Sequence, residues 1–447
     1  MKRATIVATG LSSFLTSFIG SSVNVALPSI GSEFKIDAVT LGWIATAYLL
    51  AAGVISLPFG RLADIKGRKK IFLFGLIVFG SASLLCALSN SALELIVYRT
   101  LQGIGGAMIF ATAVAILTSV FPPAERGKAI GINTGMVYLG LTTGPFFGGI
   151  LTHYIGWRSL FLVNVPICII SFLIAFKIKS EWAEARDEKY DSIGAFLYGL
   201  MLVFIIYGLT ELSLVSGVIG LLALVLFVYY ENRQKYPVFE IKLITKNQVF
   251  GLSSLAALLN YAATFAVGFL MSLYLQIVKG FDAQTAGIIL MAQPIVMVIF
   301  APIAGWISDK IEPRIVASIG MLFTAVSLIL FATLNSETSL FDLIFYLMLL
   351  GLGIGLFSSP NTNAIMSSVE KKFYSIASAT VATMRLLGQL LSMAIVMLIF
   401  SQMIGRVDIT PEIQADLIKS ASLTFKLFSI LCFLGIFASL GRGRVRR

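Results

Sequence analysis

Charged residues are scarce in this chain of 447 residues: they make up 12% of it, while apolar residues make up 58%. Soluble globular proteins carry roughly 25% charged residues. A chain with about half that share cannot cover a water-facing surface of its own size. We therefore expect the lipid bilayer to be its main solvent.

The chain also has little room outside its apolar segments. At ~20 apolar residues for each spanning helix, about fourteen segments use roughly 310 residues and leave about 137 for loops and tails. A folded catalytic, receptor or ATPase domain usually needs at least about 50 residues in one piece. The sequence therefore excludes soluble enzymes, sensors with an output domain, and pumps that carry an ATP-driven engine on the same chain.

Cysteine and histidine are too few to build a framework or a metal centre. The cysteines Cys86, Cys168 and Cys432 each lie in an apolar segment, where cysteine packs as a small core residue. The single histidine, His153, cannot form a metal site alone. The clustered His, Asp and Glu side chains of a membrane enzyme are also missing from these segments. We expect no disulfides, no metal, no cofactor and no enzymatic activity.

The apolar segments predict an all-α integral membrane protein with about fourteen transmembrane helices. The pair 192–211 and 214–230 could alternatively form one re-entrant hairpin. The predicted bounds are 5–28, 41–63, 71–89, 93–120, 128–151, 160–178, 192–211, 214–230, 248–277, 284–308, 314–333, 340–368, 374–402 and 421–440.

The net charge of +11 is distributed as membrane topology requires. In a soluble protein such an excess would suggest nucleic acid. With the N-terminus inside, the cytoplasmic loops instead collect about 25 Lys and Arg and the external loops about 6, which follows the positive-inside rule. An even number of helices places both termini in the cytoplasm. We expect a multi-pass protein of the plasma membrane, with its basic tail GRGRVRR facing anionic lipid.

The two halves of the chain resemble each other. Gly60 begins GRLADIKGRKK and Gly305 begins GWISDKIEPR, 245 residues later. Gly103 and Gly351 lie in similar glycine-rich helices, 248 residues apart. Such offsets indicate a duplicated six-helix unit, which is a transporter architecture. We expect two six-helix bundles at residues 1–180 and 248–447, with a linker and an inserted helix pair at 181–247.

A tight cytoplasmic turn follows the second helix. Gly60 and Gly67 allow the two helix ends to approach closely. Asp64 can pair with Arg68, which Lys69 follows directly, or with cations on a neighbouring helix. Such a charge clasp at the membrane surface can act as a gate. The alternative is a plain positive-inside loop.

This turn resembles the loop signature of the major facilitator superfamily, Gly-x-Leu-Ala-Asp-x-x-Gly-Arg-Lys. Residues 95–107 resemble the fourth-helix motif of that family, and residues 140–149 resemble the fifth-helix motif of its antiporters. Residues 23–28 and 157–166 are similar to drug:proton antiporters of the EmrB/QacA type, which have fourteen helices. The resemblance implies alternating access and export of amphipathic small molecules in exchange for protons.

Two arginines lie inside predicted helices. Arg99 lies about 10 Å below the outer end of its helix, where a cation must be paired or face water. The resemblance implies a role for Arg99 in coupling or substrate contact, and Gln102 shares its face. The alternative is a structural cation that is hydrogen-bonded to neighbouring carbonyls. We expect Arg385 to line the cavity, with Gln389 one turn later, or else to support packing near the cytoplasmic end.

The fifth helix carries glycines at small-xxx-small spacing, which promotes close helix packing. The same glycines, with a kink at the proline between them, could let the helix rock against its partner and seal a cavity. The residues concerned are Gly140, Gly144, Pro145, Gly148 and Gly149.

One position departs from the drug:proton branch, which has an Asp five residues before Asn24. Here that residue is Ile19, and no Asp or Glu lies near the middle of a predicted helix; Asp64 and Asp309 lie near inner ends. We therefore predict a neutral or anionic amphipathic substrate. Proton coupling would then use Glu94, the Asp64 clasp or the substrate itself. The alternative is a facilitator or importer of a neutral or anionic metabolite.

Further polar and aromatic residues in the helices are weaker candidates for lining a substrate cavity, because such side chains also serve packing and lipid belts. They are Asn24, Trp43, Tyr48, Tyr138, Asn260, Tyr261, Gln293 and Asn361.

Overall fold

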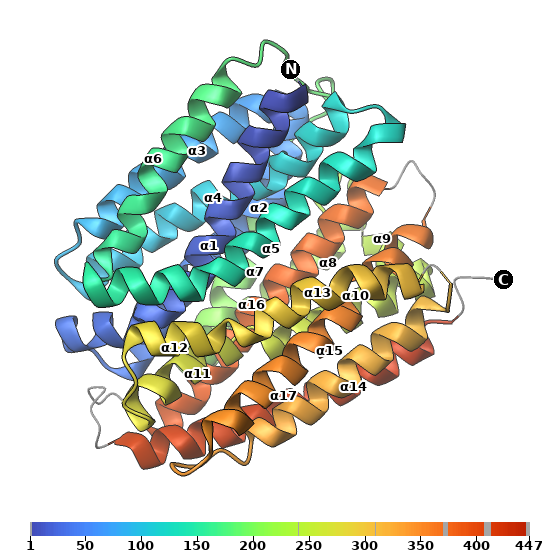
Figure 1. Ribbon diagram of the computed structural model, residues 1–447. Helices are drawn as coiled ribbons and strands as arrows, with labels where there is room; N and C mark the ends of the chain where they lie inside the picture. The colour runs from blue at the N-terminus through green and yellow to red at the C-terminus, as the bar shows by residue number, and fades with distance from the viewer. Residues whose placement is uncertain (1, 240, 309, 370–373, 406–412, 444–447) are drawn as a thin grey trace. The chain divides into compact units, whose positions relative to one another are not determined.

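The computed structural model describes residues 2–239, 241–308, 310–369, 374–405 and 413–443, and its elements are helices (Figure 1). The basic tail residues Arg444, Arg446 and Arg447, and Asp309, lie outside these ranges. The first part of the chain forms α1 (Lys2–Phe34), α2 (Ala38–Lys66), α3 (Arg68–Ala87), α4 (Ala92–Val120), α5 (Pro123–Tyr154), α6 (Arg158–Phe176), α7 (Ser192–Thr210) and α8 (Leu214–Glu231). The rest forms α9 (Ile241–Lys246), α10 (Gln248–Thr264), α11 (Val267–Leu273), the π-helical turn η1 (Tyr274–Val278), α12 (Ala283–Leu290), α13 (Ala292–Ser308), α14 (Pro313–Phe331), α15 (Leu340–Ser367), α16 (Tyr374–Met403) and α17 (Gln414–Gly441).

Within the described residues, 13 helical segments are long and apolar enough to cross a membrane. They coincide with all the predicted spans except residues 128–151. That span lies in α5, whose 32 residues are long enough, but its middle is rich in glycine and threonine. The chain is thus a multi-pass membrane protein.

The chain forms two compact units. The first comprises residues 1–36, 40–208 and 212–239, and the second comprises residues 37–39, 209–211 and 240–447. The first unit therefore holds almost all of α1 to α8, and the second holds α9 to α17.

Each unit repeats the same packing scheme. In the first, α1 packs against α4, α5 and α6, and α3 packs against α4 and α6. In the second, α10 packs against α15, α16 and α17, and α14 packs against α15 and α17. Every helix pair of the first set has its counterpart in the second, as a duplicated six-helix repeat requires.

Glycines close matching contacts in the two units. The backbone of Gly103 in α4 lies against the carbonyl of Tyr48 in α2, and Gly351 in α15 lies against the carbonyl of Gln293 in α13. The glycines are 248 residues apart and the carbonyls 245. The offsets found in the sequence are therefore those of equivalent positions in space.

A second contact follows the same offsets. A Cβ on Gly75 of α3 would lie 3.1 Å from the carbonyl oxygen of Gly105 in α4. A Cβ on Gly320 of α14 would lie 2.7 Å from that of Gly353 in α15. Backbones this close leave no room for side chains, which is how helices pack tightly in lipid.

Two predicted spans are interrupted. The span 248–277 is divided at Phe265 and Ala266, where Ser392 Oγ accepts the N–H of Ala266 at 3.0 Å. The span 284–308 is divided at Met291, because Pro294 has no N–H to donate to the carbonyl of Leu290. The short α9 was not predicted.

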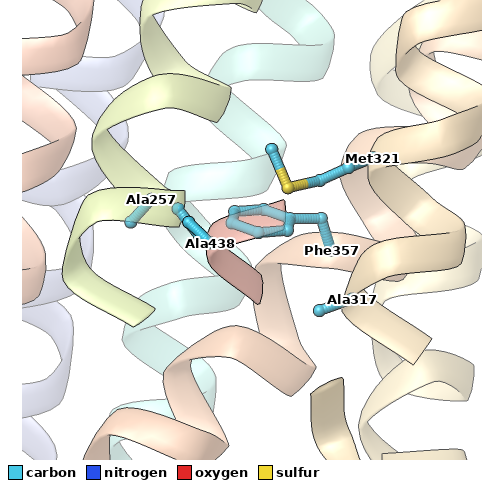
Figure 2. Close-up of a cluster of buried hydrophobic side chains, with 6 residues drawn as sticks. Ala257, Ala317, Met321, Phe357 and Ala438 are labelled. Carbon is cyan, nitrogen blue, oxygen red and sulfur yellow. The ribbon is translucent and has the colours of Figure 1, made fainter. Parts of the chain in front are cut away.

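The core of the second unit alternates large and small side chains. Met321 and Phe357 lie against each other, and Ala257, Ala317 and Ala438 surround them from α10, α14 and α17 (Figure 2). The alanines let the helices approach while the two large side chains fill the space between them.

We predict that Gly103→Ala destabilises the protein, because its Cβ would overlap the Tyr48 carbonyl. Overpacking of this kind costs about 1–3 kcal/mol. The matched control is Gly135→Ala in α5, where a Cβ meets nothing within 4 Å and alanine favours the helix. Thermal unfolding in detergent should show a lower midpoint for the first variant only; equal midpoints would contradict the contact.

Candidate functional site

The turn between α2 and α3 is closed by an ion pair. α2 ends at Lys66 and α3 begins at Arg68; Gly67 between them has φ 119°, which side chains rarely adopt. The buried Arg68 donates from Nε to Asp64 Oδ1 at 2.7 Å. Gly60 lies one turn before Asp64 in α2. The structure thus brings together the residues of the predicted gating motif.

Arg68 also connects this turn to two other segments. Its Nη1 donates to Ser119 Oγ at 2.7 Å and to the Ala115 carbonyl at 3.3 Å, both near the end of α4. It donates to Glu184 Oε1 at 2.9 Å in the segment between α6 and α7. One buried guanidinium therefore joins α2, α4 and that segment.

The segment between α6 and α7 supplies acidic partners that the sequence analysis did not identify. The backbone N–H of Lys69 donates to Glu181 Oε1 at 2.9 Å, and the Lys69 ammonium donates to the carbonyl of Ile178. Arg61 pairs with Glu188. Residues 181–188, EWAEARDE, form an acidic stretch that complements the basic turn between α2 and α3. The sequence by itself does not indicate that these two segments are in contact.

Arg99 is buried without a carboxylate partner among the described residues. Its Nε donates to the carbonyl of Ile44 at 3.2 Å, and its Nη1 donates to Gln102 Oε1 at 2.5 Å. Its guanidinium carbon lies 4.4 Å from the ring centre of Tyr48 and 5.9 Å from that of Phe161. Neutral dipoles and aromatic rings thus stabilise this cation.

Gln102 extends the network of Arg99, and Glu94 stands outside it. Gln102 Nε2 donates to Ser83 Oγ in α3 at 2.7 Å. Glu94 belongs to a variant of the capping box at the start of α4: Ser91 Oγ at the N-cap accepts its N–H at 3.2 Å, and its Oε2 accepts the N–H of Asn90, the residue before the N-cap, at 2.9 Å. These contacts give Glu94 a structural role at the helix end.

The fifth-helix motif packs against α1. Ser21 Oγ donates to the Gly140 carbonyl at 3.3 Å, and a Cβ on Gly148 would lie 2.9 Å from Ser22 Cβ. α5 stays helical through its internal proline. All of the predicted motif residues are buried: Gly140, Gly144, Pro145, Gly148 and Gly149.

Arg385 and Gln389 are half-buried in α16, on either side of a glycine contact. Gly388 between them lies against the Leu258 carbonyl and Tyr261 of α10. This contact is the counterpart of Gly140 against α1, so Arg385 corresponds to Val137, as the sequence offset indicates. Each unit therefore has its own intramembrane arginine, on a different helix.

Asn361 is occupied by structural contacts. Its Nδ2 donates to the Ser253 carbonyl at 3.0 Å, and its Oδ1 accepts from Arg442 Nη1 at 2.7 Å. Burial lowers the pKa of Arg442 to about 10, and the nearby Glu312 partly offsets this effect. Asn361 thus holds the end of α17 and is not favoured as a substrate contact.

The remaining candidates differ in their surroundings. Asn260 is buried and neither atom of its side-chain amide has a hydrogen-bond partner. Tyr48 is buried, and Trp43 packs against Tyr207 with ring centres 6.3 Å apart. The half-buried residues of this group are Asn24, Trp43, Tyr138, Tyr261 and Gln293.

The segment 157–166, which begins with WRSLF, connects the ends of three helices. Trp157 Nε1 donates to Glu33 Oε2 at 2.7 Å, and Arg158 Nη1 donates to Glu33 Oε1 at 2.6 Å. Arg158 Nη2 donates to the Ser89 carbonyl at 2.9 Å. The motif therefore joins α6 to α1 and to the end of α3, a role that required the unsuspected Glu33.

Comparison with known proteins identifies the family. The family model described as Major Facilitator Superfamily matches residues 9–393 and, in a second match, residues 253–445. The chain belongs to the major facilitator superfamily. It is thus a secondary transporter and not an enzyme.

The chain is similar to proteins that are named for different substrates. Riboflavin transporter RibZ of Clostridioides difficile (strain 630) is 30% identical over 426 residues, which cover 95% of this chain and 93% of RibZ. Multidrug resistance protein 3 of Bacillus subtilis (strain 168) is 30% identical over 365 residues, 79% of this chain and 71% of the relative. An inward-facing, unoccupied crystal structure of a bacterial homologue of the lysosomal transporter Spinster has a TM-score of 0.70 at 17% identity, and the match covers 99% of this chain and 97% of that chain.

The intramembrane part of this transporter is short of acidic groups. Ile19 is buried in α1, and the glycine contacts make Ala263 of α10 its counterpart. The described Asp and Glu residues all lie in loops or within the terminal turns of helices. The middle of the described helices thus contains arginine and no carboxylate.

We predict that Asp64→Asn destabilises the transporter more than Glu184→Gln. The Asp64 side chain is 31% exposed and accepts from the buried Arg68, whereas that of Glu184 is 66% exposed. A hydrogen bond to a charged group is worth about 1.5–3 kcal/mol, and an exposed ion pair at most about 1 kcal/mol. Thermal unfolding in detergent measures the difference, and the reverse order would contradict this account of the clasp.

Proposed function

We propose that this transporter exports neutral or anionic amphipathic small molecules by alternating access, in exchange for protons. We place it in the plasma membrane with both termini in the cytoplasm, as the distribution of Lys and Arg favours. The relative named for multidrug resistance supports a drug-like small molecule as the substrate. We further propose that residues 1–180 and 248–447 are the moving bundles and that 181–247 carry the linker and inserted pair.

The observation that supports a neutral or anionic substrate is the set of uncharged partners around the Arg99 guanidinium. Dipoles and rings stabilise this cation but do not neutralise it. The middle of each described helix lacks a carboxylate, and α1 has Ile19 where the drug:proton branch has an acid, so no described carboxylate there offsets the charge of Arg99. A permanent cation would meet repulsion there, while a neutral or anionic compound would not. We propose that Arg99, Gln102, Arg385 and Gln389 shape this preference.

The coupling group is better sought in the Asp64 clasp than in Glu94. The Glu94 carboxylate is committed to its capping box. Asp64 is partly exposed and its partner Arg68 connects three segments, so protonation of Asp64 would weaken a contact on which the whole network depends. The glycine-lined α5 would rock against α1 as the network opens.

A second candidate is a facilitator or importer of a neutral or anionic metabolite without proton exchange. The observation that favours it is the match to a riboflavin transporter over 95% of this chain. The absence of an acid at position 19 fits this candidate as well.

Liposomes with an internal pH dye separate the two candidates. We predict that neutral and anionic amphipathic compounds cause proton movement, that permanent cations do not, and that Arg99→Ala abolishes the response. The panel should include riboflavin, because of the relative named for it. Arg233→Ala is the matched control, because it removes an exposed arginine outside the helices.

Three outcomes have distinct meanings. Compound uptake or release without proton movement would favour the facilitator. Faster movement of permanent cations than of anions would contradict the proposed charge preference. Equal loss of activity in Arg99→Ala and Arg233→Ala would show that Arg99 has no specific role.

A further inference from the structure

An apolar chamber of about 280 Å³ lies in the first unit between α2, α4 and α7. A stripe of α2 from Trp43 to Ile55 forms one wall, and a stripe of α4 from Ile96 to Ile104 forms another. Val203 of α7 borders it on the third side. The helix pair inserted between the two repeats thus forms part of a cavity with the first repeat.

α7 touches α2 at both ends of the chamber and leaves a gap between. Gly199, Val203 and Tyr207 lie four residues apart, on one face of α7. The Tyr207 ring packs against Trp43, and a Cβ on Gly199 would lie 3.1 Å from Val54 Cγ1. Val203, midway between these contacts, is too short to fill the space beneath it.

The walls offer hydrocarbon contact almost alone. No charged side chain lines the chamber, and the Thr100 hydroxyl donates to the carbonyl of Ile96 in its own helix at 2.9 Å. Sites for transported or metabolic solutes carry a few polar groups that fix orientation. A chamber without them fits a ligand that is itself a hydrocarbon.

The length and volume of the chamber indicate which kind of hydrocarbon ligand it can hold. Its walls run along the helices for about 12 Å on α4 and about 18 Å on α2, at 1.5 Å per residue. One leaflet of a hydrocarbon core of ~30 Å is about 15 Å deep. A cavity of about 150 Å³ already holds benzene, so this volume accommodates a longer chain lying along the helices.

We propose that this chamber binds one acyl chain of a membrane lipid, which packs α7 against α2 and α4. The adjoining surface of α4 is apolar and exposed at Val97 and Leu101, so a chain can enter directly from the bilayer. The lipid would act as a structural ligand that attaches the inserted pair to the first repeat. This binding is independent of what the protein transports.

Trp43 is a built-in reporter of the occupant, because it lines the chamber. The purified full chain is reconstituted in phosphatidylcholine with brominated acyl chains, which quench tryptophan on contact. The emission of Trp43 is the difference between the wild type and Trp43→Phe. We expect brominated lipid to remove most of it. Val203→Phe, which fills the chamber, should restore the Trp43 emission and retain one lipid fewer per chain after purification in detergent.

Val225→Phe in α8 is the matched control, since this valine is 65% exposed and is not among the residues that line this chamber; it should leave both readouts as in the wild type. Trp306, which is 60% exposed, shows that the brominated lipid quenches an exposed tryptophan. If Trp306 is quenched but Trp43 is not, the chamber holds no acyl chain. If Val203→Phe leaves Trp43 quenched and the lipid count unchanged, lipid reaches Trp43 by another route and the proposal is wrong.

Discussion

The rest of the structure depends on one constraint: the hydrocarbon core of a bilayer offers no hydrogen-bond partners, so unpaired polar groups are too costly there. Each backbone N–H and C=O must be satisfied within the protein, which makes the chain helical where it crosses. Where the helix breaks at Ala266, Ser392 of another helix accepts the N–H. For the same reason, the described carboxylates lie in loops and in the terminal turns of helices. Arg99 is tolerated because a carbonyl, an amide and two aromatic rings surround its guanidinium. What the membrane excludes therefore also determines which charges remain in the middle of the described helices.

Close backbone contact replaces hydrophobic attraction between these helices, since lipid is as apolar as the side chains. Gly103 against Tyr48 and Gly351 against Gln293 show the same solution in both units. Such contacts do not deform gradually, so they hold the helices of each unit in fixed positions against one another. The repeat is nevertheless chemically unequal: the position of Arg99 corresponds to Leu347 in the second unit. Duplication explains the shared scaffold, and Arg99 is a departure from it.

The sequence predicted those features that depend on local composition. Hydropathy set the span bounds closely, and the offsets of 245 and 248 residues anticipated equivalent contacts. The pairing of Asp64 with Arg68 follows from their closeness in sequence, because they are four residues apart on either side of the turn at Gly67. The sequence could not predict which acidic residues pair with the turn between α2 and α3, or with Trp157, because these partners come from segments distant in the chain. They are Glu181, Glu184 and Glu188 for the turn and Glu33 for Trp157. The break at Met291 follows from Pro294, but hydropathy does not register a missing N–H.

The central claim is that arginine without a neighbouring carboxylate makes this transporter reject cations. Tetraphenylborate and tetraphenylphosphonium have nearly the same size and opposite charge, so their binding to purified protein isolates the effect of charge. We expect the wild type to bind the anion more tightly, Ile19→Asp to reverse the order, and Ile19→Asn to leave it unchanged. Tighter binding of the cation by the wild type would contradict the claim directly.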